Sequence, residues 1–387
     1  MPFQSMVFKA LVAALSVSTA LAAAVPEKHS SKIVSLDFRR EKYTGGKSFN
    51  GTAASGEKRD VIPVDLGRDQ IMYLIQVNAG SEADTITVQL DTGSSNTWFP
   101  VVGATCPCSE SARYDPDNSY TSEYLYGPLT LYYGIGQAQG SFYKDTVALT
   151  EQPQVSLSNL QFAGVTDTDL NYGILGIGFD NGEFTTEYPN FAQTLKDQGY
   201  VSKNAYSLYL NSADATQGSI LFGGKDTAKY QGQLSTLPIT HPYRLAVALN
   251  SFSIGSFSVN GNQTNSMFDS GTTYTWLVPG IFDPLAAHFG WTQPDPSNPS
   301  HIGPCQGDDV VFDFGYNTKI TIPYNLMVLP YQGNQCYIKI FRTRGTEVLN
   351  TLGDNFLRSV YTVFDLDNRQ LQVAPVVYTT ASNIVPL

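Results

Sequence analysis

Two short segments of the chain place an aspartate directly before a hydroxyl residue and a glycine. They read Asp91-Thr92-Gly93-Ser94 and Asp269-Ser270-Gly271-Thr272, and each follows an apolar run typical of a strand. Two carboxyl groups that meet share one proton. One of them can then take a proton from a water molecule while the other gives a proton to a carbonyl oxygen. The chemistry that the pair predicts is general acid–base catalysis, which needs no metal, cofactor or nucleophilic side chain.

The two segments belong to an internal repeat. A tryptophan, Trp98 or Trp276, follows each aspartate by seven positions. Gly176 follows the apolar pair Ile174-Leu175 and lies 85 residues after Asp91. Gly353 follows Thr351-Leu352 and lies 84 residues after Asp269. Matching offsets predict two copies of one structural unit, related by a pseudo-twofold axis that brings the two aspartates together.

The residues that follow each aspartate have predicted supporting roles. Gly93 and Gly271 let the backbone turn sharply and approach the carboxyl groups. Ser94 and Thr272 can donate hydrogen bonds to the outer carboxyl oxygens.

The composition predicts an all-β protein. Of the 387 residues only 15% are charged, whereas Gly (33), Tyr (23), Phe (21) and Pro (21) are abundant, as in short strands joined by tight turns. A formal net charge of −11 argues against a nucleic-acid partner, which would select a basic face. A hydrophobic content of 42% argues against disorder.

The N-terminus predicts export and processing. Residues 1–22 form a signal peptide pattern, with Lys9 before an apolar run that ends at a small-x-small cleavage site. No stretch predicts a membrane anchor, so we expect a secreted, extracellular protein, with a vacuolar destination as the alternative. Residues 23–59 are expected to be a basic pro-segment that ends at the dibasic pair Lys58-Arg59; an uncut linker is the alternative.

The charge is divided unevenly between these parts. Residues 25–59 hold eight Lys/Arg against four Asp/Glu. Residues 60–387 hold 14 Lys/Arg against 30 Asp/Glu, a net charge of −16. A basic leader on an acidic body predicts a zymogen whose own pro-segment docks electrostatically and is released when carboxylates are neutralised.

Four cysteines fit an oxidising compartment. Cys305 and Cys336 are expected to pair, whereas Cys106 and Cys108 could form a tight bridge across one residue. A zinc site is the competing interpretation, but it lacks C-x₂-C spacing and a histidine cluster. Of two glycosylation sequons, at Asn50 and Asn262, only Asn262 would survive processing.

The aspartate motifs resemble those of the pepsin-like aspartic proteases, and the similarity covers residues 60–387. Further stretches that resemble the family are Leu131-Tyr132-Tyr133-Gly134-Ile135-Gly136, Ile174-Leu175-Gly176, Gly218-Ser219-Ile220-Leu221-Phe222-Gly223-Gly224, Leu352-Gly353-Asp354 and Phe356-Leu357-Arg358. Cys305 and Cys336 match the disulfide of the second lobe. The segment Val77–Gln89 lacks the Gly-Thr-Pro-Pro turn of animal members and is similar to secreted fungal ones.

The resemblance implies a bilobal fold of two pseudo-twofold related β lobes with a few short helices, at 60–240 and 241–387. It implies a monomeric endopeptidase that hydrolyses protein or peptide substrates at acidic pH, between bulky apolar residues. Asp91 would activate the water and Asp269 would begin protonated. The flap that closes over the substrate would carry Tyr133 and Gly134, with Trp98 beside the tyrosine. Ile135 and Tyr172 differ from the residues usual in the family.

Other functions are less well supported. No G-x-S-x-G motif supports a serine hydrolase, and no H-E-x-x-H motif supports a metalloprotease. The alternative from another class is an inactive secreted binding protein on the same fold. Among local elements, the pattern predicts helices over 191–198 and 355–360, and strands over 86–90, 207–210 and 245–249.

Overall fold

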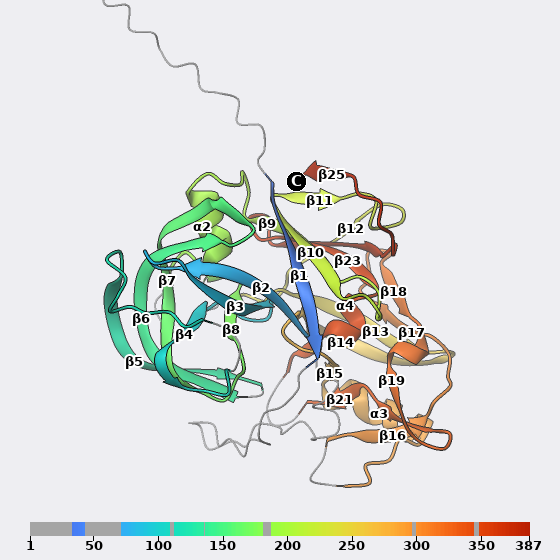
Figure 1. The fold of residues 1–387 in the computed structure, drawn as a ribbon. Helices are drawn as coiled ribbons and strands as arrows, with labels where there is room; N and C mark the ends of the chain where they lie inside the picture. Colours follow the sequence, from blue (N-terminus) through green and yellow to red (C-terminus); the bar gives the residue numbers. More distant parts are fainter. Residues whose placement is uncertain are drawn as a thin grey trace, which may run out of the picture. The chain divides into compact units, whose positions relative to one another are not determined.

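The computed structural model describes residues 33–42, 71–108, 112–134, 136–180, 187–295, 299–343 and 348–387 (Figure 1). The predicted signal peptide at 1–22, the predicted processing pair Lys58-Arg59 and Ile135 lie outside these ranges. Strands account for 55% of the structure and helices for 8%, which confirms the all-β prediction. In the described ranges, every helix is too short or too polar to cross a membrane.

Thirteen strands form one large sheet. In chain order they are β1 (Val34–Lys42), β2 (Ile71–Ala79), β3 (Asp84–Asp91), β4 (Trp98–Thr105), β5 (Glu123–Tyr133), β6 (Gly136–Leu149), β7 (Gln152–Thr168), β8 (Gly173–Gly176), β9 (Ala205–Tyr209), β10 (Gln217–Phe222), β12 (Ser235–Pro238), β23 (Val360–Asp365) and β24 (Gln370–Pro375). Their order across the sheet is β12-β24-β23-β9-β10-β1-β2-β3-β8-β4-β7-β6-β5. Strands β1–β10 and β12, all before residue 240, therefore share this sheet with β23 and β24 from the C-terminal part of the chain.

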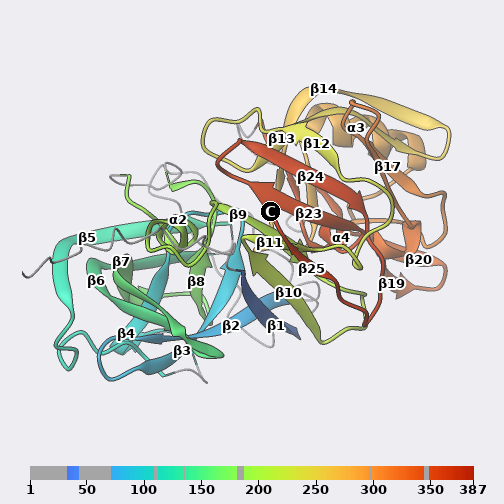
Figure 2. The same cartoon turned by 90° about the horizontal axis from the view of Figure 1, so that it is seen from above.

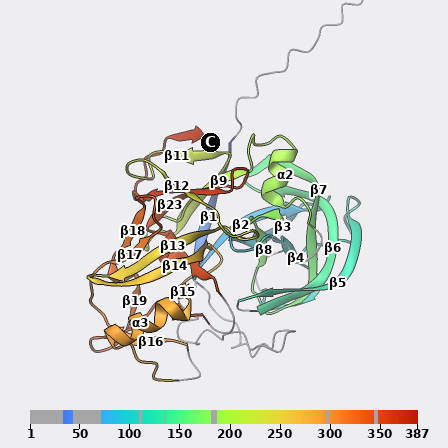
Figure 3. The same ribbon diagram turned by 180° about the vertical axis from the view of Figure 1, so that it is seen from behind.

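A second sheet has seven strands, in the order β18-β17-β13-β14-β22-β15-β21. Its members are β13 (Ala246–Ile254), β14 (Phe257–Phe268), β15 (Thr275–Leu277), β17 (Val310–Asp313), β18 (Lys319–Ile322), β21 (Ile340–Arg342) and β22 (Asn350–Leu352). Two smaller sheets contain β16 (His301–Pro304), β19 (Val328–Gln332) and β20 (Gln335–Ile338), and β11 (Gly224–Asp226) with β25 (Ile384–Pro386). Figure 2 shows β4–β7 on one side and β13, β14 and β17 on the other, and the view from behind in Figure 3 agrees.

The two halves repeat the same strand pairings, as the spacing predicts. β3 pairs with β8 in parallel, and β4 pairs with β7 in parallel. In the second half β14 pairs with β22 and β15 with β21, again in parallel. Even the single antiparallel contact is matched, because Trp98 lies opposite Ile174 and Trp276 lies opposite Thr351. The internal repeat is therefore a repeat of topology.

The helices are short and few. They are α2 (Phe191–Asp197), α3 (Pro279–Phe289), α4 (Asp354–Leu357) and the 3₁₀ turn η2 (Tyr324–Leu326). The predicted helix over 191–198 is confirmed as α2, whose N-cap Asn190 accepts a hydrogen bond from the Gln193 amide. The sequence pattern missed α3, although its signals are present: Pro279 stands in the first turn, and Gly290 ends the helix at φ 63°.

Strand β1 holds a central place in the large sheet. It pairs with β10 from Val34 to Arg39 and with β2 from Arg39 to Lys42. Val34, Leu36 and Phe38 are buried, and the Phe38 ring packs on Tyr73 at 5.1 Å between centroids. Alternation of apolar and polar residues places one face of β1 in the core.

Candidate active site

Each aspartate of the repeat lies where a strand ends inside a parallel pair. Asp91 ends β3, and its carbonyl accepts a hydrogen bond of 3.0 Å from the Ile177 amide, just beyond β8. Asp269 follows β14, and its amide donates a hydrogen bond of 3.0 Å to Leu352 of β22. Two strands fixed by parallel ladders thus hold the two aspartates.

The carboxyl group of Asp91 is held by its own loop. The Gly93 amide donates to Oδ1 at 2.8 Å, and the Ser94 hydroxyl donates to Oδ2 at 2.5 Å. Such bonds to charged oxygens are short and strong. The side chain of Asp91 is therefore fixed in one orientation.

The carboxyl group of Asp269 has the same two kinds of donor. The Gly271 amide donates to Oδ1 at 2.8 Å, and the Thr272 hydroxyl donates to Oδ2 at 2.6 Å. Both aspartates are buried, with 6% exposure for Asp91 and 7% for Asp269. The residues expected to support the pair thus make equivalent contacts in the two halves.

The two glycines show how closely the carboxyl groups approach. A Cβ atom at Gly93 would lie 2.4 Å from Oδ1 of Asp269, and one at Gly271 would lie 2.5 Å from Oδ1 of Asp91. Each glycine thus lies against the carboxyl group of the opposite half. Only a residue without a side chain leaves room for the pair to meet.

The close approach changes the acidity of Asp269. Burial first, and the neighbouring charge of Asp91 second, raise the pKa of Asp269 to about 7, although the hydrogen bonds from Thr272 and Gly271 act in the opposite direction. Because the two carboxyl groups interact, they titrate as a pair. Below neutral pH the pair can hold one shared proton, the state that acid–base catalysis by two carboxyl groups requires.

The two loops also lock together through their second residues. The Thr92 hydroxyl donates to the Phe268 carbonyl at 2.8 Å and accepts from the Ser270 amide at 2.9 Å. The Ser270 hydroxyl donates to the Leu90 carbonyl at 2.9 Å and accepts from the Thr92 amide at 3.1 Å. Sequence reasoning gave no role to Thr92 and Ser270, although a hydroxyl residue at the same place in both motifs was a usable signal.

A further residue that the sequence did not single out is Arg244. It lies between β12 and β13, and its Nη1 donates a hydrogen bond of 2.9 Å to the Gly93 carbonyl. No motif marks it, since a single arginine in a loop has no distinctive pattern. Its contact ties the connection between the halves to the loop of Asp91.

The predicted flap lies at the hairpin of β5 and β6. Tyr133 ends β5 and pairs with Gly136, while Gly134 lies exposed in the turn. Trp98 is fully buried, and its ring lies 6.4 Å from the Tyr133 ring between centroids. Burial raises the pKa of the Tyr133 hydroxyl, and the Asp91 charge raises it further. The hairpin thus places Tyr133 close enough to Asp91 for the Asp91 charge to affect the pKa of the Tyr133 hydroxyl.

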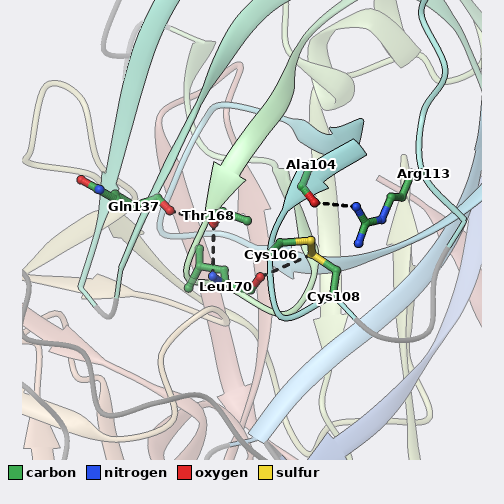
Figure 4. Close-up of a disulfide and its surroundings, with 7 residues drawn as sticks. All are labelled: Ala104, Cys106, Cys108, Arg113, Gln137, Thr168 and Leu170. Atoms are coloured by element: carbon green, nitrogen blue, oxygen red, sulfur yellow. Dashed lines mark hydrogen bonds between the residues drawn. A yellow bond between two sulfur atoms is a disulfide. The ribbon is translucent and has the colours of Figure 1, made fainter. Parts of the chain in front are cut away.

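Both cysteine pairs form disulfides. Cys305 is bonded to Cys336 beside β16 and β20, and Cys106 is bonded to Cys108 at the end of β4. Figure 4 shows the second bond beside the Leu170 carbonyl, which lies 3.6 Å from Cys108 Sγ.

Three further expectations concern the described residues. Asn262 lies exposed within β14, at φ 51°, where the register with β13 shifts. Among the described residues no cluster of His, Cys, Asp or Glu could hold a metal ion. Tyr172, which differs from the residue usual in the resembled family, donates a hydrogen bond of 2.9 Å to Glu41 of β1.

Comparison with known proteins finds similarity to aspartic proteases. The family profile described as eukaryotic aspartyl protease matches residues 72–376. Candidapepsin-3 of Candida albicans (strain WO-1) is 38% identical over 405 aligned positions, which cover 100% of both chains. Secreted aspartic protease 1 of Candida albicans is 38% identical over 404 positions with the same coverage, and secreted aspartic protease 8 is 38% identical over 397 positions that cover 94% of each chain.

Proposed function

The chain belongs to the eukaryotic aspartyl protease family, and on this premise we propose that it is a secreted aspartic endopeptidase whose reaction is carried out by Asp91 and Asp269. The observation that supports these two residues is the contact of the two carboxyl groups across Gly93 and Gly271. Nothing in the two motifs favours the inactive binding protein, because both carboxyl groups keep their complete sets of donors.

In the proposed reaction the pair begins with one proton, held on Asp269, whose pKa is raised by burial and by the neighbouring charge of Asp91. Ionised Asp91 takes a proton from a water molecule, whose oxygen attacks the peptide carbonyl carbon. Asp269 gives its proton to the carbonyl oxygen, which forms a neutral tetrahedral intermediate. Collapse breaks the C–N bond: Asp91 gives its proton to the leaving nitrogen, and one hydroxyl group of the intermediate returns its proton to Asp269 as the carbonyl is restored. The pair ends with one proton, as it began.

We propose that the flap hairpin sets both access and preference. Tyr133 packs with Trp98 in a cluster of apolar side chains that includes Leu131 and Ile174. Closing such a surface over a bound peptide excludes water and favours bulky apolar side chains next to the cleaved bond. Acidic conditions are favoured because a shared proton is lost as the pH rises through the pKa of Asp269, about 7.

We further propose that residues 23–59 are a pro-segment released after Lys58-Arg59. The docking of this segment is supported by β1, a strand of the segment that lies at a central place in the large sheet. Mass spectrometry of the secreted protein should find Asp60 as the first residue. Replacing Lys58 and Arg59 by alanine should retain the longer form, whereas Lys47→Ala should not.

Cleavage of an internally quenched apolar peptide at pH 3–5, with and without pepstatin, tests the catalytic proposal. Asp91→Asn and Asp269→Asn should each lose at least about a thousandfold in kcat/KM, a loss typical of essential catalytic groups. The exposed carboxyl Asp283, which pairs with Arg342, provides the control Asp283→Asn. Equal activity of Asp269→Asn and the parent would refute the assignment.

A further inference from the structure

A basic cavity lies where the C-terminal end of β1 meets the second half of the chain. It encloses about 150 Å³. Four of its lining residues are cations, Arg40 and Lys42 of β1 together with Lys339 and Arg358. None of the described lining residues is acidic. The buried carboxyl of Asp354, which is bonded to Arg358, offsets one of the four charges, and the remaining excess of positive charge favours an anion.

Arg40 carries the strongest sign of an incomplete site. Its Nη1 donates to the Ala213 carbonyl and, at 3.3 Å, to the Ala215 carbonyl, so its head group is held in place. Its Nε is buried and has no hydrogen-bond partner among the described residues. A buried donor without a partner is costly, so any rearrangement that brings an acceptor to Nε would stabilise this side chain. Burial lowers the pKa of Arg40, and the nearby charge of Arg358 lowers it further.

The opposite wall is rigid. Arg358 donates to the buried carboxyl of Asp354 at 2.7 Å, and Tyr73 donates to the other oxygen of the same group. Thr273 accepts from the Ile71 amide at 3.0 Å, and Asn355 donates to the Lys339 carbonyl at 3.0 Å. The guanidinium of Arg358, fixed by its bond to Asp354, is thus prepared for a ligand before it binds.

The size of the cavity and the guanidinium groups select the kind of anion. A cavity of about 150 Å³ is several times larger than the roughly 10–15 Å³ that one water requires, so it has room for a small ion. Guanidinium groups bind oxyanions through two parallel N–H···O bonds. We propose that this cavity binds a small tetrahedral oxyanion, such as free sulfate or phosphate, and that the bound anion fastens the end of β1 to the second half.

The consequence for regulation rests on the proposed pro-segment. Arg40 and Lys42 both lie within residues 23–59, so the site is complete only while this segment remains in place. A bound oxyanion therefore stabilises the precursor and slows the departure of β1. The anion site itself does not depend on proteolytic activity.

Thermal unfolding of the full precursor tests the site. The precursor carries Asp91→Asn to prevent self-cleavage, and sulfate is added from 0 to about 20 mM at pH 6, with NaCl holding the ionic strength constant. Saturable binding should raise Tm by several degrees. Arg40→Gln and Lys42→Gln should each weaken sulfate binding at least about tenfold. Arg39→Gln is the matched control, since Arg39 is paired with Glu41 at 2.9 Å and does not line the cavity.

The outcomes separate the possible explanations. Sulfate also stabilises proteins by exclusion from their surface, and an equal rise of Tm in all variants would reveal that effect and overturn the site. No rise in the parent would overturn it as well. If Arg40→Gln does not fold, Lys42→Gln decides, because Lys42 is exposed at the strand end.

A second measurement addresses regulation alone. Conversion of the active precursor at pH 4–5 should slow several-fold in sulfate, and Lys42→Gln should abolish the slowing. Saturable binding without slower conversion would refute the regulatory consequence and leave the anion site standing. A chain that binds sulfate but cleaves no peptide would refute the proposed function and not the site.

Discussion

At the scale of single residues, we expect the carboxyl group of Asp269 to link both activity and stability to pH. Its pKa, raised to about 7 by burial and by Asp91, lies well above the ordinary value of 3.8. The folded protein therefore binds this proton more tightly than the unfolded chain does. Stability from this group is complete below about pH 4 and is lost as the pH rises toward 7.

Replacing Asp269 by asparagine should remove this dependence. The parent should lose up to about 4 kcal/mol of unfolding free energy between pH 4 and 7, at about 1.4 kcal/mol for each pH unit. Asp269→Asn should lose clearly less. Urea unfolding at pH 4, 5.5 and 7 measures the difference, with the exposed Glu82→Gln as control. Parallel pH profiles for Asp269→Asn and the parent would contradict the prediction.

The glycines between the carboxyl groups predict a steric effect. Gly93→Ala and Gly271→Ala each place a methyl group within 2.5 Å of a carboxyl oxygen of the opposite half. We expect loss of peptide cleavage and about 1–3 kcal/mol of destabilisation from overpacking. Gly280→Ala is the control, because no atom lies within 4 Å of its Cβ position and it stands in α3. It should be neutral or slightly stabilising.

The hydroxyl groups that lock the two loops should act together. Thr92→Val leaves the Ser270 amide and the Phe268 carbonyl without their partner, which should cost about 2–4 kcal/mol. Ser270→Ala should cost a similar amount, and the double variant should cost less than the sum. Denaturant unfolding of the three variants gives the coupling, and Thr92→Ser should restore most of the stability. Strict additivity would show that the two hydroxyls do not form one network.

At the scale of elements, the two disulfides close loops of very different length. Cys305 and Cys336 are 31 positions apart, and Cys106 and Cys108 only two. Loop entropy then predicts that the double variant Cys305→Ser, Cys336→Ser loses about 3–4 kcal/mol of unfolding free energy. The double variant Cys106→Ser, Cys108→Ser should lose only about 1–2 kcal/mol. Urea unfolding of both double variants checks the ratio. A larger loss from the short loop would show that packing near Leu170 outweighs loop entropy.

Elements with local signals were predictable, and elements set by distant contacts were not. Asn190 and Gly199 predicted α2 within one residue of its end. The pairing of β23 with β9 joins residues more than 150 positions apart, and no local pattern encodes it. In the site, the repeat indicated both aspartates and their supporting residues. Arg244 escaped detection because its role comes only from its place between the halves.

At the scale of the whole molecule, charge predicts how the cleaved leader departs. Residues 60–387 carry −16 at neutral pH and the basic leader +4 over 25–59, so the two parts attract. Below about pH 4 most carboxyl groups are protonated, both parts become positive, and the attraction turns into repulsion.

Protein cleaved after Arg59 should therefore retain the leader at pH 7 and low salt and lose it below about pH 4. Size-exclusion chromatography with mass detection measures retention. The apolar contacts of Val34, Leu36 and Phe38 should keep part of the leader bound at pH 7 even in high salt. Full release at pH 7 in 0.5 M NaCl would show that charge alone holds it.

The place of β1 in the large sheet also bears on cooperativity. Among the described strands, β10 and β2 are joined in the sheet through β1. While β1 is present, the backbone ladder is continuous from β12 to β5. We therefore expect calorimetry to record one unfolding endotherm. The amides of residues 34–39 should exchange with deuterium only when the whole protein unfolds. If β1 leaves as proposed, β10 and β2 lose the strand that joins them, and we expect a hinge at this place that the precursor lacks.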